Sequence, residues 1–263
     1  MNDITRNEIK NLVKSTVLTK FENFKLETEY KPFFQRLFSE KEIVTGALIQ
    51  SLYTSFGMSV YEQIAVILAK SAGFHAERQY TLLGEIDDKT EQIIDNYWKM
   101  LKSAIKNKEN IKSDKKLEFK MIANSIKNGR ALIDGDSTVD VYIRKPNGEE
   151  FFIDITTVKN NLKSFEVLKL KMLRWIGLRL STNSDAKFNT LIAIPYNPYY
   201  PNEYINSRWN AVILDGKNDI LVQDDFWNFV GNDSRTYDEL LSIFAEVGNE
   251  IKVEINEFFD NLQ

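Results

Sequence analysis

The chain has 263 residues, 43% of them hydrophobic, which suffices for one substantial core or for a core with a smaller appendage. It contains no cysteine and a single histidine, His75, so disulfide frameworks, cysteine-based zinc sites and multi-histidine sites are excluded. The formal net charge is −4, but acidic residues crowd the C-terminal third, whereas Lys and Arg dominate residues 99–127 and 159–179, which leaves room for a basic, nucleic-acid-facing side.

The sequence predicts no targeting or membrane segment. Its first residues lack the apolar core of a signal peptide, and no stretch of consecutive apolar residues approaches the roughly 18 that a membrane span needs. We therefore expect a cytoplasmic protein with no membrane partner. The whole chain, residues 1–263, is interpreted as one domain with an embellished periphery.

The N-terminal part, residues 1–75, is predicted to be helical. Helices are expected near residues 7–24, 40–52 and 58–71, the last of which ends at Gly73, in the position that glycine favours after a helix.

Beyond the helical part the pattern changes twice. Residues 99–127 are rich in Lys and Asn with apolar residues interspersed, which predicts an exposed insertion or a solvated charged helix. A period of two follows in residues 138–143 and 150–157, and the turn-forming residues Lys145-Pro-Asn-Gly148 join these runs. The pattern predicts a β-hairpin within residues 138–159.

The C-terminal half is predicted to alternate helices and strands. The expected elements are a helix at 165–180, a buried strand at 190–194 that Pro195 ends, a further strand at 211–214 or 220–222, and helices from 225 and from 236. The order of elements predicts an α/β fold, a mixed β-sheet flanked by helices.

Two carboxylates are candidates for a metal site in the hairpin. Asp140 and Asp154 each stand mid-strand between β-branched residues, and strands paired across so short a turn can bring both to one side of the sheet. Such a site of hard oxygen ligands suits Mg²⁺, which retains water molecules and can activate one against a phosphodiester. The alternative is that both acids merely face solvent on an edge strand.

The spacing around these acids strengthens the metal hypothesis. An acid on one strand, a second strand carrying acid-x-Lys, and a helix bearing cations is the motif of PD-(D/E)xK nucleases. Here it reads Asp140, then Asp154, with Thr156 where the motif has its lysine and Lys159 three residues further on. A lysine in the motif position stabilises charge in the transition state, so Thr156 predicts impaired cleavage, which Thr156→Lys should raise at least tenfold.

A broader resemblance covers most of the chain. It rests on the strings FQRLF (34–38), IQSLYTSFG (49–57), NTLIAIPYNPY (189–199), DFWNF (225–229) and TYDELL (236–241). These look like the TdeIII family of type II restriction endonucleases, whose second strand carries Asp/Glu-x-Lys-Thr-x-Lys. Asp154, Thr157 and Lys159 match that pattern, whereas Thr156 departs from it.

The resemblance implies a restriction-endonuclease-like fold with helical N-terminal and C-terminal elaborations. It also implies Mg²⁺-dependent cutting of double-stranded DNA at a short palindrome, in the manner of a type II site-specific deoxyribonuclease, with GGNCC-like sites among its relatives. A palindrome calls for a homodimer, because each protomer addresses one strand.

Further residues receive candidate roles. Glu62, on the helix before the hairpin, is a candidate third metal or water ligand, or else an ordinary exposed helical acid. Lys159 or Thr156 is expected to position the attacking water. Glu77 is a weaker acid candidate, and His75 is interpreted as a surface or core residue.

DNA contacts are expected from two segments. Lys163, Lys171 and Arg174 share one side of the helix after the hairpin and could follow phosphates, although a solvated helix face explains them as well. The candidates for reading base edges, in a loop that could instead be a packed aromatic one, are Tyr196, Asn197, Arg208 and Asn210.

Two other functions remain open. One is a nuclease-fold protein that binds DNA but cuts it slowly or not at all, because Thr156 replaces the lysine. The other is a nuclease acting on RNA or branched DNA. Cleavage tests with and without Mg²⁺ on different substrates separate these possibilities.

Overall fold

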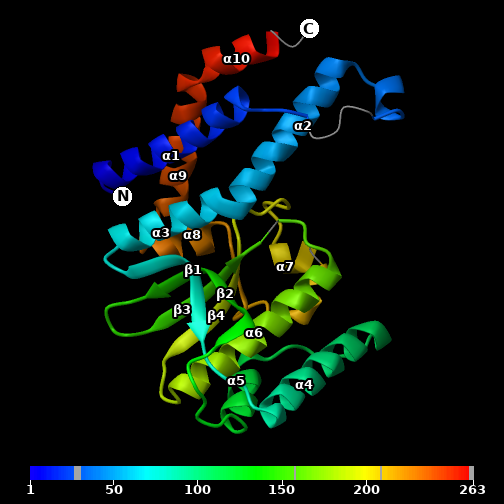
Figure 1. Cartoon of the computed structure of the whole chain (residues 1–263), viewed down its shortest axis with the longest axis vertical. Helices are drawn as coiled ribbons and strands as arrows, with labels where there is room; N and C mark the ends of the chain where they lie inside the picture. The colour runs from blue at the N-terminus through cyan, green and yellow to red at the C-terminus, as the bar shows by residue number, and fades with distance from the viewer. Residues whose placement is uncertain (27–30, 157, 208, 261–263) are drawn as a thin grey trace.

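A computed structural model describes residues 1–26, 31–156, 158–207 and 209–260, apart from the side chains of 136, 209 and 210 (Figure 1). Among these residues five strands form one sheet in the order β1-β2-β3-β4-β5. The strands are β1 (His75–Leu83), β2 (Ile133–Arg144), β3 (Glu150–Ile155), β4 (Phe188–Ile194) and β5 (Ile220–Val222). Pairing is antiparallel from β1 to β3 and parallel from β3 to β5, so the predicted mixed sheet is confirmed.

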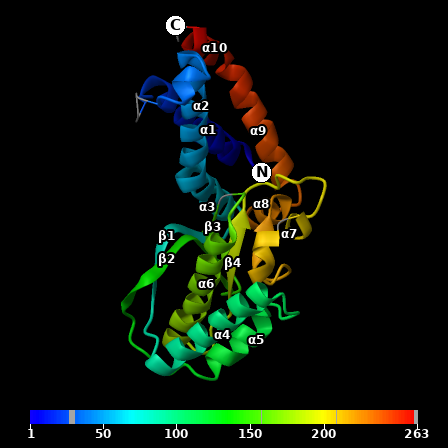
Figure 2. The same ribbon diagram turned by 90° about the vertical axis from the view of Figure 1, so that its right-hand side faces the viewer.

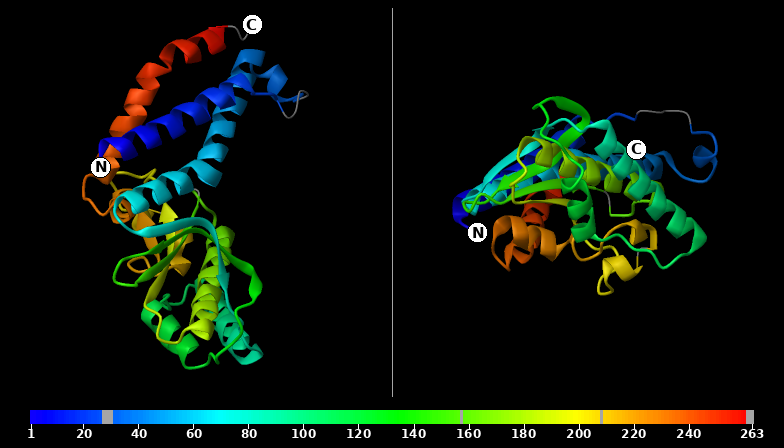
Figure 3. Two further views of the ribbon diagram at one scale, coloured as in Figure 1. Left: turned by 60° about the vertical axis from the view of Figure 1, so that its left-hand side comes forward. Right: turned by 90° about the horizontal axis from the view of Figure 1, so that it is seen from below.

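Helices flank the sheet, and several extend beyond one end of it as an arm (Figures 1 and 2). They are α1 (Asp3–Glu22), η1 (Phe34–Arg36), α2 (Glu40–Ser55), η2 (Phe56–Val60), α3 (Tyr61–Ser71), α4 (Asp88–Asn107), α5 (Lys115–Ala123), α6 (Leu162–Thr182), α7 (Tyr204–Ser207), η3 (Trp209–Ile213), α8 (Asp224–Gly231), α9 (Thr236–Glu250) and α10 (Lys252–Asp260). The arm consists of α1, α2, α9 and α10 (Figure 3).

The sheet carries an apolar core on each face. Phe151, Ile153 and Leu191 pack with residues of α1, α3, α8 and α9. Phe152 and Ile192, of opposite parity along their strands, pack with residues of α4 and α6. Because both faces are covered, β3 is buried on both sides, as expected of a central strand. A polar group on β3 is therefore buried as well.

Both ends of the chain meet in the arm. Ile9 and Val13 of α1 lie in the same core as residues of α9. On the outside, Lys10 Nζ lies 2.5 Å and Lys14 Nζ 3.1 Å from the two carboxylate oxygens of Glu250. Intramolecular ion pairs thus neutralise part of the negative charge of the C-terminal third.

The predicted elements are largely present. The hairpin forms β2 and β3, Gly73 has a φ of +83° after α3, and the later strand is β5 rather than 211–214, most of which lies in η3. The two helices expected at 40–52 and 58–71 instead run together as α2, a π-helical turn and α3.

One continuous helix spans Glu40–Ser71. Within the described part of the chain it is long and apolar enough, by length and composition alone, to cross a membrane. Polar residues interrupt its sequence, so the expectation that no long stretch of consecutive apolar residues occurs is not contradicted. Only 17% of its most apolar window is buried.

The expectation of an exposed insertion over residues 99–127 is wrong. Leu101 of α4 and Ile122 of α5 are buried in the core beside α6. The Lys-rich composition was misleading because two of its charged residues, Lys115 and Glu118, are themselves buried.

Those two residues belong to a buried ionic cluster between α5, α6 and the residue before β5. Lys169 Nζ lies 2.6 Å from both Glu118 Oε1 and Asp219 Oδ2, and Lys115 Nζ lies 2.8 Å from Asp219 Oδ1. Thr190 also accepts hydrogen bonds from Lys115. Burial acts to raise the pKa of Asp219, but the two ammonium groups outweigh it and hold that pKa below its usual value. With two cations and two carboxylates, the cluster is balanced.

Removing one cation should leave the buried cluster with excess negative charge and destabilise the fold. We expect Lys169→Met to lower the free energy of unfolding by about 3–5 kcal/mol, because Glu118 and Asp219 would then share one cation in a buried place. Urea denaturation measures the change, with Lys163→Met, an exposed residue on the first turn of α6, as the control. A loss below about 1 kcal/mol for Lys169→Met would contradict a structural role for the cluster.

Candidate active site

Asp140 and Asp154 face each other across β2 and β3. The pairing Val141 with Ile153, extended by one position, sets Asp140 opposite Asp154, and directly opposite residues point to one face of a sheet. Asp140 Oδ2 also accepts a hydrogen bond of 2.9 Å from the Ile155 amide. Asp154 is only 7% exposed. The hairpin therefore joins two carboxylates at a half-buried point of the sheet.

A lysine from α6 completes this pair. Lys171 Nζ lies 2.5 Å from Asp154 Oδ2, and it also lies over the Trp175 ring at 5.0 Å from the centroid. The helix is the crossover between the parallel strands β3 and β4, so it packs on the sheet face where Phe152 and Asp154 point. An ammonium group thus stands beside the second acid, although it does not come from the strand.

Three polar side chains link α3 to these carboxylates. Glu62 is 3% exposed, and its Oε2 accepts hydrogen bonds from Arg78 Nη2 at 3.1 Å and Gln79 Nε2 at 3.0 Å. The same Gln79 amide lies 3.4 Å from Asp140 Oδ1. Gln79 therefore bridges Glu62 and Asp140.

The bridge requires an unusual backbone. Gln79 has a φ of +48°, in the left-handed region that non-glycine residues rarely adopt, although it lies within β1. The register with β2 is unbroken on both sides of it, Arg78 pairing with Val141 and Tyr80 with Val139, so Gln79 stands opposite Asp140. The backbone is thus unusual in its φ at the residue that contacts both acids, and strain of this kind concentrates at functional sites.

The electrostatics of the site favour a cation. Burial, followed by repulsion from Asp154, raises the pKa of Asp140 to about 6, and Glu62 adds to the shift. The amide of Ile155 and the ammonium of Lys171 only partly oppose it. Uncompensated negative charge therefore remains at Asp140.

This donor set fits Mg²⁺. Asp140 and Asp154 offer hard oxygen ligands, and a divalent ion between them would relieve the mutual repulsion that, after burial, raises the pKa of Asp140. Within the described residues no group of three or more His, Cys, Asp or Glu side chains is arranged to hold a metal. Two protein carboxylates with water in the other positions suit Mg²⁺, which seldom occupies an all-protein cage.

The two residues expected to position water lie differently. Thr156 continues the pairing with β4, its amide donating to Ala193 O at 3.0 Å, and its hydroxyl accepts a hydrogen bond of 2.6 Å from Asn160. Lys159 is exposed in the following turn, and no described carboxylate pairs with it. Thr157 lies outside the described residues.

Two of the three α6 cations predicted to contact DNA phosphates already form ion pairs within the protein. Lys171 contacts Asp154, and Arg174 pairs with Glu91 and with Asp134, the latter at 2.7 Å. These cations face inward because α6 lies between the sheet and α4. Lys163 alone of the three predicted residues is exposed.

The loop after β4 lies at the same sheet edge as Asp154, since β3 and β4 run parallel. Asn197 is engaged within that loop, for its side chain donates to Asn202 O and accepts from the Tyr199 amide. Tyr196 is half-buried. Arg208 lies outside the described residues, and the side chain of Asn210 is likewise not described.

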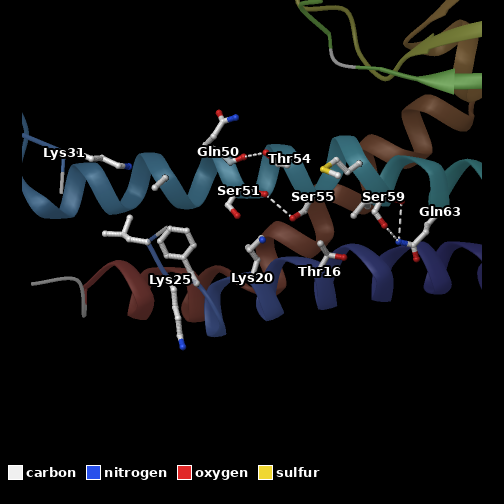
Figure 4. Close-up of a pocket in the computed structure, with 15 residues that line it drawn as sticks. Thr16, Lys20, Lys25, Lys31, Gln50, Ser51, Thr54, Ser55, Ser59 and Gln63 are labelled. Atoms are coloured by element: carbon white, nitrogen blue, oxygen red, sulfur yellow. Dashed lines mark hydrogen bonds between the residues drawn. The ribbon is translucent and has the colours of Figure 1, made fainter. Parts of the chain in front are cut away.

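A separate cleft of about 700 Å³ lies between α1 and α2 (Figure 4). Among the residues that the structure describes, its lining includes Lys20, Lys25 and Lys31 and no acidic side chain, and Figure 4 shows Ser51 and Ser55 on the side of α2 that faces α1. It ends at Ser59 and Gln63, next to Glu62 on α3, but none of the candidate metal ligands lines it.

Sequence reasoning thus identified the two acids but assigned Lys171 only to phosphate contact. The single available signal was a lysine in the crossover helix of a motif that lacks its strand lysine. Arg78 and Gln79 were not predicted, because their contacts with Glu62 depend on how α3 packs beside β1 and, for Gln79, on a positive φ.

One comparison identifies a related family. A family model described as "Type II restriction endonuclease, HinfI" matches residues 1–248. Among curated proteins, none matches the sequence. The resemblance to the TdeIII family is narrower than this match and stays a prediction.

Asp140→Asn should stabilise the metal-free protein. The folded chain binds the Asp140 proton more tightly than the unfolded chain, where the pKa is near 3.8, so the ionised acid destabilises the fold above pH 6 and is relieved as pH falls. We expect a gain of about 1–3 kcal/mol at pH 8 in EDTA, shrinking towards pH 5. Urea denaturation at both pH values measures it, with the exposed Asp185→Asn as control. Equal effects at pH 8 and pH 5 would contradict the shifted pKa.

Backbone strain at Gln79 has its own test. Gln79→Gly and Gln79→Ala lose the same hydrogen bonds, but only glycine adopts a positive φ freely. We therefore expect the glycine variant to be more stable than the alanine variant by about 1 kcal/mol in urea denaturation. An alanine variant of equal or higher stability would show that this φ carries no strain.

Proposed function

The chain belongs to the HinfI family of type II restriction endonucleases, and on that premise we propose that it cuts double-stranded DNA at a short palindrome with Mg²⁺ held between Asp140 and Asp154. The family implies a site-specific deoxyribonuclease that binds double-stranded DNA. A soluble, cytoplasmic homodimer acting in a restriction system is the form we propose for it. The GGNCC-like recognition sequence stays a prediction.

The contact between Lys171 Nζ and Asp154 Oδ2 supports this proposal most directly. A PD-(D/E)xK site needs a cation next to its second acid, and Thr156 cannot supply one. Lys171 brings an ammonium to that acid from α6 instead. On this reading cleavage is not impaired, in contrast to what the strand motif alone predicts.

Each residue then has a role in hydrolysis. Asp140 and Asp154 hold the metal ion, which when bound supplies Lewis-acid stabilisation of the phosphate and activation of a water molecule. Lys171 orients the attacking water and offsets charge that accumulates on the phosphate in the transition state. In-line attack leaves a 5′-phosphate and a 3′-hydroxyl.

Glu62 acts in this scheme as a positioning residue. Its Oε2 already accepts hydrogen bonds from Arg78 and Gln79, so its charge is largely satisfied within the protein. Through Gln79 it fixes the orientation of Asp140. Direct metal ligation by Glu62 would require those donors to move.

DNA is proposed to cross the sheet edge where β3 and β4 end. Lys159 and Lys163, both exposed after β3, are suited to phosphate contacts, and the loop containing Tyr196 and Asn197 lies at the same edge. Arg174 is left out of this set because two carboxylates already neutralise it.

Lys171 provides the decisive test. We expect Lys171→Ala to lower the cleavage rate of bacteriophage DNA in Mg²⁺ by about 10²-fold or more, because it removes the ammonium beside the reacting phosphate. Lys187→Ala, an exposed lysine before β4, is the matched control and should cleave at the wild-type rate.

A second variant separates a catalytic role from a structural one. Adding Thr156→Lys to Lys171→Ala returns an ammonium to the strand, so we expect recovery of at least about tenfold. Failure of Lys171→Ala to slow cleavage would remove Lys171 from the mechanism. Binding of duplex DNA without Mg²⁺-dependent fragments from the wild type would identify the alternative, a DNA-binding protein that does not cut.

A further inference from the structure

The outer side of α2 presents an apolar surface to solvent. It consists of residues on or beside η1 and on α2 that face away from the sheet, namely Phe33, Phe34, Leu37, Phe38, Ile49 and Tyr53, here called the outer α2 surface. Phe33 is 83% and Leu37 75% exposed, and the Phe34 and Phe38 rings stack on each other at 6.2 Å. Between η1 and α2 lies a hollow of about 1010 Å³.

The positions of the apolar side chains on α2 indicate that a partner covers this surface in the functional protein. Its inner side buries Val44 and Leu48, while Ile49 and Tyr53 lie on the opposite side and are exposed. Exposed apolar side chains that gather in one patch mark an interaction surface. Gly46 also faces the hollow, and a Cβ there would meet nothing within 4 Å.

The exposed area matches what one side of a protein interface requires. The aromatic residues Phe33, Phe34, Phe38 and Tyr53 are 83, 58, 49 and 60% exposed. At roughly 200 Å² for a whole aromatic side chain, they expose roughly 500 Å² together. That alone reaches the largest patches usual on a monomer, roughly 300–600 Å². With Leu37 and Ile49 the surface approaches the roughly 800 Å² of one partner in a standard interface.

The charges at its edge suit a partner with the same surface. Lys31 and Glu42 line the same hollow, and no described residue forms an ion pair with Lys31. Glu42 caps α2 through Ser39 and keeps a negative charge, its pKa lowered by the backbone and side-chain hydrogen bonds of Ser39. In a two-fold contact each residue of one copy meets the other residue of its partner. Lys31 of one copy can therefore face Glu42 of the second.

The position of the surface also suits a second copy. Each chain carries one pair of candidate metal ligands, whereas cutting both strands takes two. Tyr53 precedes Glu62 by nine residues on the continuous helix from α2 to α3, roughly 14 Å along its axis. A contact through α2 would thus hold two sites in a fixed relation.

We propose that the outer α2 surface is the two-fold interface between two copies of this chain, an inference that deepens the proposed cutting of both DNA strands. The variant Leu37→Asp tests it, because an ionised carboxylate is costly in an apolar contact. The control is Leu241→Asp on α9, 51% exposed and outside the surface. Circular dichroism verifies that both variants are folded.

Sedimentation at micromolar concentration distinguishes the outcomes. We expect a particle of twice the 30.6 kDa chain mass for the wild type and for Leu241→Asp, and the chain mass itself for Leu37→Asp. On supercoiled plasmid, Leu37→Asp should accumulate nicked circles before linear DNA. A dimeric Leu37→Asp, or a monomeric wild type with and without duplex DNA, would overturn the interface. So would a monomeric wild type that sediments with phosphatidylcholine vesicles, which would assign the surface to lipid. The sedimentation mass does not depend on DNA cleavage. The interface can therefore be confirmed even where the protein proves not to cut DNA.

Discussion

The position of α6 on the sheet depends on Lys169. Its ammonium is buried between Glu118 and Asp219, and a buried charge tolerates little displacement from its partners. Lys171 follows two residues later, about 200° further round the helix. An anchor at Lys169 therefore fixes both the rotation and the axial position of α6, and with them the reach of Lys171 to Asp154.

The same helix is tied at its other end. Arg179 Nε lies 2.6 Å from Glu150 Oε2, at the start of the strand that later carries Asp154. The two ends of β3 are thus joined by ion pairs to the middle and the last turn of α6, through Lys171 and Arg179, around an apolar core that includes Phe152 and Trp175. A site assembled from a strand and a helix requires such a rigid relation. Moving the lysine by one position along the helix would turn it away from the strand by about 100°.

Local patterns predicted much of this fold and the pairing of two carboxylates in its candidate site. The period of two revealed the hairpin, and the mid-strand positions of Asp140 and Asp154 marked them, because both signals depend only on neighbours in sequence. Lys171 could not be assigned in the same way. Its contact with Asp154 depends on how the crossover helix lies over the sheet, and a helical lysine alone equally well suits solvent.

Buried charge caused the clearest misreading. Lys115 and Glu118 contribute to a polar composition that indicates exposure, yet they pair within the core. Likewise Gln79 reaches Glu62 and Asp140 only through a positive φ that no sequence pattern announces. Ion pairs between distant segments and irregular backbone are both products of the assembled fold.

The packing of α1 against α9 has a consequence for the order of folding. Ile9 and Val13 share a core with Val247, and Lys10 pairs with Glu250, contacts that span more than two hundred residues. During synthesis α1 emerges first, but its apolar side is fully covered only when α9 leaves the ribosome. α3, which carries Glu62, packs on α1 in the same core. The arm, and the packing around the helix that carries Glu62, are therefore completed last, so a nascent chain is kept from full assembly until translation of α9 ends.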